Sequence, residues 1–161
     1  MISINFLEYA TIILNYAAAL TVLASDGVGD DIHPVLLNWA DNTSAVRWNN
    51  HSCKKSLVGK ALGSLFCTML IDSPLGVNAK WISTSVNVIA DNISRVKKDS
   101  PDSNFDYLSL KLKYPQLRDC RLLQPITELL SMIWDVMLMK NLPNPKALGN
   151  LKHSGLGKLT I

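Results

Sequence analysis

The stretch LLNWADNTSAVRW, residues 36–48, places a carboxylate directly after a run of mostly apolar residues. The run from His33 to Asp41 predicts a strand covered on both faces, because such strands are apolar almost throughout. Residues 42–44 offer side chains that can cap a short helix running to about residue 50. A charge at the inner end of a strand is costly to desolvate, so Asp41 needs a helix cap, a cationic partner or a metal ion.

Further helices and one more strand are expected on either side of this stretch. Residues 4–23 predict a helix that is apolar on nearly all sides and buried in a core, with Asn5 as its cap and Glu8 in its first turn. The order of these elements predicts an α/β fold that is rich in helix and has few strands. The remaining expected elements are a helix over residues 57–71, a strand over 77–83 and a short helix over 86–96.

The chain changes character at DSPDSN, residues 99–104, which has the composition of a linker. Residues 124–141 predict an amphipathic helix. Residues 142–161 are rich in Gly, Pro and Lys and are expected to form a loosely held basic tail. We therefore divide the chain into a domain over residues 1–98 and a helical C-terminal extension over 99–161.

The composition indicates a folded protein in a reducing compartment, the cytoplasm or the nucleus. With 48% apolar and 18% charged residues, the 161-residue chain can form one core and is too apolar for disorder. Three widely spaced cysteines without a CxxC pair argue against a zinc site and against a disulfide framework. Basic residues gather in clusters that suit a nucleic acid or, equally, an ordinary solvated surface: Arg47, Lys54, Lys55 and Lys60; Arg95, Lys97 and Lys98; Lys111, Lys113, Arg118 and Arg121.

The uncharged run over residues 9–24 leaves a second localisation open. VLASD, residues 22–26, resembles a cleavage site, so residues 1–24 could be a signal or an anchor of a secreted or membrane-attached protein. No Lys or Arg precedes Arg47, however, and the run is short for a membrane span of about 20 apolar residues. A buried helix is therefore preferred, and membrane attachment is the minority interpretation.

Three blocks of the sequence carry a resemblance to a known family. They are INFLEYATIILNYAAAL (4–20), ADNTSAVRWNNHSCKKS (40–56) and WISTSVNVIADNISR (81–95). In this order they resemble the ribonuclease H domain of retrotransposon reverse-transcriptase polyproteins, over about residues 3–98. The third block matches best, at Asn87, Ala90, Asp91, Ser94 and Arg95.

The resemblance implies a metal-dependent hydrolase of RNA in RNA–DNA hybrids. Glu8, Asp41 and Asp91 would be its catalytic residues and would bind magnesium (Mg²⁺) or manganese (Mn²⁺). Two such ions, about 4 Å apart, stabilise the attacking and leaving oxygens of a phosphodiester. The nucleic-acid-binding residues would be Arg47, Trp48, Lys54, Lys55 and Arg95, although a Trp near a strand end is more often part of a core.

The chain also departs from the family pattern. The family domain opens with a three-stranded unit whose first strand supplies another catalytic Asp, and no counterpart precedes Glu8. Ser83 and Thr84 stand where the family has a Pro-Gly turn. These departures imply an incomplete, N-terminally truncated ribonuclease H-like fold with impaired catalysis, a pseudoenzyme that binds nucleic acid, or a protein partner or second copy at its uncovered sheet edge. An active hydrolase is the alternative.

Each of the three carboxylates also has a local explanation that needs no ligand. Asp41 could cap the helix that follows it, and Glu8 could belong to a capping box. Asp91 could simply favour a helix N-terminus through the helix dipole. Sequence alone leaves both explanations open for each residue.

Overall fold

The computed structural model describes residues 2–26, 33–71, 73–94, 107–120, 122–125, 127–139 and 157–160. It is a mixed α/β structure, rich in helix and with few strands, as predicted. The elements in chain order are α1 (Ile4–Asp26), β1 (Val35–Ala40), α2 (Thr43–His51), α3 (Leu57–Leu70), β2 (Gly76–Trp81), α4 (Val88–Ser94), α5 (Tyr107–Lys113), the 3₁₀ turn η1 (Pro115–Leu117), β3 (Leu122–Pro125), α6 (Thr127–Met137) and β4 (Gly157–Thr160).

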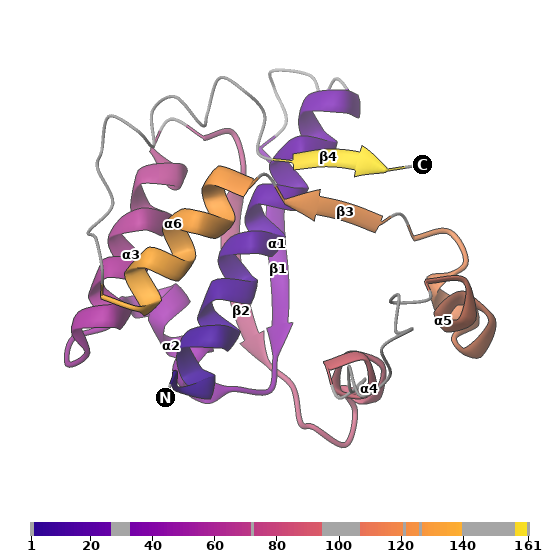
Figure 1. Cartoon of the computed structure of the whole chain (residues 1–161), viewed down its shortest axis with the longest axis horizontal. Coiled ribbons are helices and arrows are strands. Elements are labelled where there is room, and N and C mark those ends of the chain that lie inside the picture. The colour runs from indigo at the N-terminus through magenta and orange to yellow at the C-terminus, as the bar shows by residue number, and fades with distance from the viewer. Residues whose placement is uncertain are drawn as a thin grey trace.

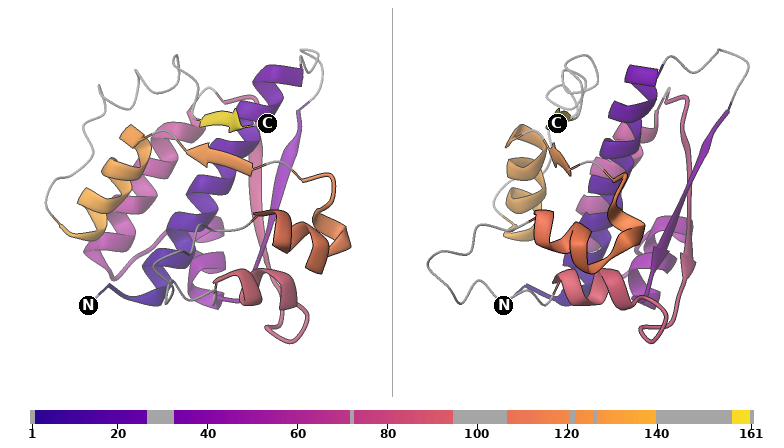
Figure 2. Two further views of the ribbon diagram at one scale, coloured as in Figure 1. Left: turned by 45° about the vertical axis from the view of Figure 1, so that its right-hand side comes forward. Right: turned by 90° about the vertical axis from the view of Figure 1, so that its right-hand side faces the viewer.

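The described elements form layers, which Figure 2 shows edge-on. β1 and β2 make a parallel two-stranded sheet, in register from Val35 opposite Gly76 to Ala40 opposite Trp81. α1 and α3 lie against one face of this sheet, and α6 lies on the far side of these two helices (Figures 1 and 2). α2 and α3 occupy the connection between the strands, as parallel pairing requires a long crossover. β3 and β4 form a separate antiparallel pair.

The core lies between α1, α3 and α6. The aromatic ring of Tyr16 packs edge-on against Phe66, with centroids 5.2 Å apart, and its hydroxyl donates to the Leu75 carbonyl at 2.9 Å. α1 is therefore a central helix of this core, as predicted, while Ile4 near its start is 61% exposed. The largest fully buried side chains come from these three helices: Tyr9, Ile13, Tyr16, Leu62, Leu65, Leu129 and Val136.

α1 also passes the length and composition test for a membrane span over Ile4–Ser25. One-third of its most apolar window is buried inside the protein. Core helices of soluble proteins and N-terminal signal sequences pass the same test. Localisation therefore stays a prediction.

β1 is covered on one face only, so the expectation of a strand covered on both faces is wrong. Asn38 and Ala40 point toward the helices and are buried, whereas Val35, Leu37 and Trp39 point away and are exposed. An apolar run carries no alternation that would reveal this difference. The described helices pack against the sheet from one side, and this packing decides which side chains are buried.

Two local expectations also need correction. Ser3, and not Asn5, caps α1: the Ser3 hydroxyl accepts from the Asn5 N–H at 3.3 Å, and Glu8 lies beyond the first turn. α6 begins at Thr127, because the residues just before it form β3. β4 lies within the stretch expected to be a loose tail, and the predicted linker at residues 99–104 lies outside the described residues.

Candidate acidic site

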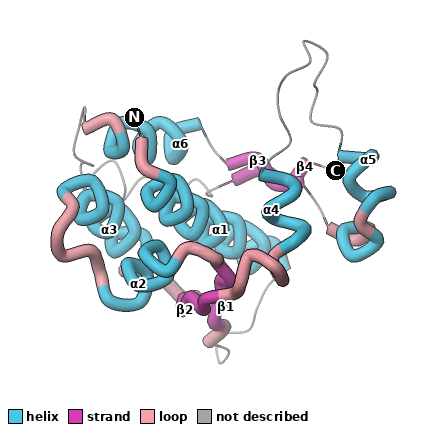
Figure 3. The backbone as a smooth tube through the Cα atoms, turned by 90° about the horizontal axis from the view of Figure 1, so that it is seen from below, coloured by secondary structure: helices cyan, strands magenta, loops and turns pink. Residues whose placement is uncertain are grey.

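The candidate site lies at the end of the sheet where β1 and β2 terminate. The first turns of α1 and the start of α2 reach this end, and α4 lies near it as well (Figures 1 and 3). In sheets of parallel strands, ligands typically bind beyond the carboxyl ends of the strands. The carboxylates of Glu8 and Asp41 lie at this end of the sheet.

Glu8, in the second turn of α1, and Asp41, directly after β1, are brought together here. Both side chains are half-buried. Burial raises the pKa of the Glu8 carboxyl, and the nearby negative charge of Asp41 raises it further. Two carboxylates close enough to repel each other form a site that favours a proton or a cation.

Asp41 is held by the last residue of β2 and by the loop that follows it. Its Oδ2 accepts a long hydrogen bond from the Thr84 hydroxyl at 3.4 Å, and its carbonyl accepts from the Trp81 indole N–H at 3.1 Å. Asp41 does not cap α2, because the Asn42 side chain does so by accepting from the Ala45 N–H at 3.0 Å. The helix-cap explanation of Asp41 is therefore wrong, and its side chain remains available to a ligand.

A hydrogen bond between two side-chain amides joins α1 to the start of α2. The Asn42 Nδ2 donates to the Asn5 Oδ1 at 2.8 Å, so Asn42 both caps α2 and contacts α1. Asn5 and Glu8 are three residues apart and therefore share a face of α1. Sequence reasoning assigned Asn5 to a cap and missed this role; the signal was a polar side chain three residues before Glu8 in an otherwise apolar helix.

Asp91 lies in α4, where its N–H donates to the Asn87 carbonyl at 3.0 Å. Among the residues that the structure describes, no three His, Cys, Asp or Glu side chains form a group that could hold a metal ion. Mg²⁺ keeps several of its waters and is commonly bound through one or two carboxylates, so a metal site on Glu8 and Asp41 alone also stays a prediction. A metal site that also includes Asp91 stays a prediction.

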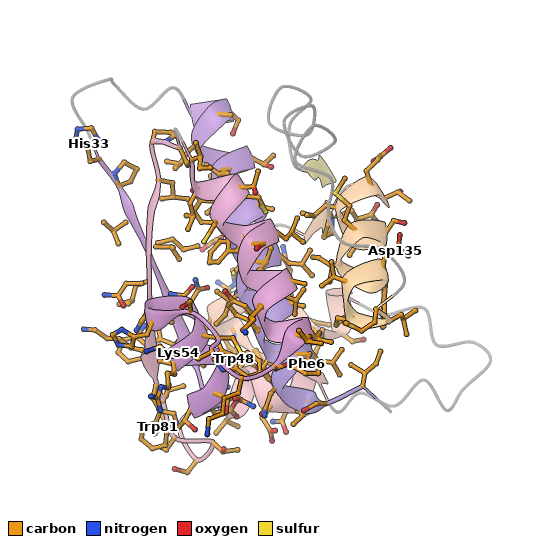
Figure 4. All side chains as sticks on the ribbon, turned by 90° about the vertical axis from the view of Figure 1, so that its left-hand side faces the viewer. Phe6, His33, Trp48, Lys54, Trp81 and Asp135 are labelled. Atoms are coloured by element: carbon orange, nitrogen blue, oxygen red, sulfur yellow. The ribbon has the colours of Figure 1, made fainter. Side chains whose placement is uncertain are left out.

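Among the predicted nucleic-acid-binding residues, the described basic side chains are exposed, whereas the tryptophan is part of the core packing. Arg47, Lys54 and Lys55 are exposed, on α2 and in the joint between α2 and α3. Trp48 instead packs against the core, stacked on Phe6 with centroids 5.7 Å apart and edge-on to Tyr9 at 5.8 Å, as the core interpretation expected. In Figure 4, Lys54 lies on the side of the molecule that carries the sheet. Arg95 lies outside the described residues.

Comparison with family models, with curated proteins and with solved structures finds no match to this chain.

Proposed function

We propose that this chain is a retroelement-derived, ribonuclease H-like protein that binds nucleic acid and whose catalysis is impaired. The observation that carries the proposal is the Glu8–Asp41 pair. The two residues come from separate blocks of the resemblance, and the charge of Asp41, directly after β1, is near enough to raise the pKa of Glu8. No local capping role accounts for either of them, since Ser3 caps α1 and Asn42 caps α2.

Exposed basic side chains support the binding part of the proposal. α2 begins two residues after Asp41, and Arg47 projects from it into solvent. Lys54 and Lys55 follow in the next joint and are exposed as well. Exposed cations such as these can attract the phosphates of a nucleic acid electrostatically. An RNA–DNA hybrid suits such a surface, because it is recognised mostly by backbone shape and the 2′-hydroxyl.

The acidic pair itself supports the proposal that catalysis is impaired. Glu8 and Asp41 would hold one Mg²⁺ or Mn²⁺, which would supply a more acidic bound water near the phosphodiester. Thr84 would orient Asp41 through its hydrogen bond. The raised pKa of Glu8 lets it keep a proton more readily than an ordinary glutamate when no cation is bound. A two-ion mechanism would need further carboxylates beside this pair.

Binding and cleavage of a labelled RNA–DNA hybrid test the proposal. We expect hybrid affinity to fall steeply with salt, and the double variant Lys54→Gln with Lys55→Gln to lower the slope of log K against log salt by about 1–2. A matched double variant, Lys113→Gln with Arg118→Gln, removes two exposed charges elsewhere and should bind like the wild type. Binding that ignores salt, or equal losses in both variants, would refute the binding surface.

Cleavage is measured on the same hybrid with magnesium or manganese, beside Asp41→Asn. We expect little or no cleavage by the wild type or by the variant. Rapid cleavage that disappears in Asp41→Asn would refute the impairment and establish the alternative, an active metal-dependent hydrolase. Rapid cleavage that survives in Asp41→Asn would refute the role of the acidic pair.

A further inference from the structure

The outer edge of β2 is already closed by a side chain of α2. The Asn50 Nδ2 donates to the Ala79 carbonyl at 2.8 Å, and the Asn50 Oδ1 accepts from the Ala79 N–H at 3.0 Å. The amide thus contacts both backbone groups of Ala79, as a neighbouring strand would. No further strand can pair at this point without displacing Asn50.

Among the described residues, the outer edge of β1 has no such cover. Gly76 and Ile82 donate to the carbonyls of Pro34 and Ala40, so the even-numbered residues of β1 face β2. The backbone groups of Val35, Leu37 and Trp39 therefore point to the outer edge, because successive residues of a strand alternate. In the part of the chain that the structure describes, no hydrogen bond reaches these three residues from that side.

β1 also lacks the features that normally protect an edge strand. The sequence VLLNWA contains neither a charge nor a proline, whereas natural edge strands carry charges, prolines or bulges that prevent pairing. Val35 is 65% exposed, Leu37 39% and Trp39 56%, all on the face of the sheet away from the helices. A two-stranded sheet with one such apolar face gains stability from additional strands.

We propose that the edge of β1 pairs with β1 of a second copy of this chain, antiparallel and centred on Leu37. In this register Leu37 lies opposite itself across the two-fold axis, and Val35 lies opposite Trp39 of the second copy. All three outward-facing residues then form hydrogen-bonded pairs, which exchange two backbone bonds each. The product is a four-stranded sheet in which β2 of each copy lies outermost, with its edge closed by Asn50.

A second copy is the occupant that this strand fits best, because the strand is complementary to itself. Pairing an aromatic with a β-branched residue across strands is favourable, and the register gives Trp39 with Val35 twice. The strand is uncharged, so two copies bring no like charges together, although the whole chain carries a net charge of +3. The self-complementarity of β1 does not depend on the nuclease resemblance, so either proposal can fail alone.

Analytical ultracentrifugation of the full chain tests this register. We expect the wild type to dimerise, and Leu37→Lys and Leu37→Glu to raise the dimer dissociation constant about tenfold or more, since each places like charges directly opposite one another. An equimolar mixture of the two variants should dimerise again, because Lys then opposes Glu. Leu57→Lys replaces a more exposed leucine, 68% exposed at the start of α3, and should dimerise like the wild type.

Circular dichroism establishes that each variant is folded. A wild type that stays monomeric up to its solubility limit would overturn the proposal. Dimers that persist unchanged in both Leu37→Lys and Leu37→Glu would also overturn it. A mixture of Lys and Glu variants that remains monomeric would overturn the register centred on Leu37.

Discussion

Replacing Glu8 by Gln should stabilise the protein at neutral pH. Burial and the charge of Asp41 both raise the pKa of Glu8, so the ionised carboxylate is the unfavourable form in the folded state. Glutamine keeps nearly the same shape and removes that charge. The folded protein holds the Glu8 proton more tightly than the unfolded chain, so protonated Glu8 contributes stability below its ordinary pKa. This contribution is lost as the pH rises through the raised folded-state pKa.

The size of the effect follows from how far Glu8 is buried. The side chain is half-buried and partly hydrated, which screens its charge and keeps the gain to about 1 kcal/mol or less. In a chain of this length, 1 kcal/mol corresponds to a rise in Tm of about 2–4 °C. Burial contributes more to the raised pKa of Glu8 than the charge of Asp41 does. Most of the gain should therefore remain when Glu8→Gln is made in an Asp41→Asn background.

Urea unfolding at several pH values measures the difference between wild type and Glu8→Gln. We expect the gain to be largest at neutral pH and to vanish at acidic pH, where Glu8 is protonated in both folded and unfolded chains. Glu128→Gln, at an exposed position on α6, is the control and should give no comparable gain. A Glu8→Gln protein that is less stable than the wild type at neutral pH would refute the reasoning.

Two further predictions concern the contacts that hold the sheet and core in place. Asn50→Ala removes both hydrogen bonds to Ala79 and should destabilise the protein by about 1–3 kcal/mol, measured as a lower urea midpoint; an unchanged midpoint would show that the bonds add nothing. Tyr16→Phe leaves a buried carbonyl without its donor and should lower stability by about 1–3 kcal/mol. Tyr114→Phe, at a surface hydroxyl, should lose less, and equal losses in both variants would contradict this account.

The sequence predicted elements well where a local pattern determines them. The apolar stripe of residues 57–71 gave α3 almost to its ends, and the polar residues after Asp41 gave the start of α2 without singling out Asn42 as its cap. Both features depend on neighbours within one or two turns of helix, which is the range that such patterns report. The predicted boundaries of these two helices therefore differ from the observed ones by only a few residues.

Features that depend on distant partners could not be predicted in this way. The contact between Asn5 and Asn42 joins separate elements, as does that between Asn50 and Ala79, and an asparagine in a sequence does not indicate its partner. The exposed face of β1 was missed because its run is apolar at both odd and even positions. Only the resemblance suggested that Glu8 and Asp41 meet, since local rules assigned both to helix caps.

Glu8 and Asp41 contribute little that the fold itself needs. Ser3 and Asn42 cap the two helices, and Asn5 with Asn42 joins α1 to the start of α2, so both carboxylates could be neutral without losing these contacts. Burial of Glu8, and next the nearby charge of Asp41, instead destabilise the ionised form of Glu8. Charged groups placed together at such a cost are typical of functional sites. A hydrated Mg²⁺ is commonly bound through one or two carboxylates, whereas two-ion catalysis needs more ligands. Under the proposed function, cation binding would therefore survive the loss of two-ion turnover.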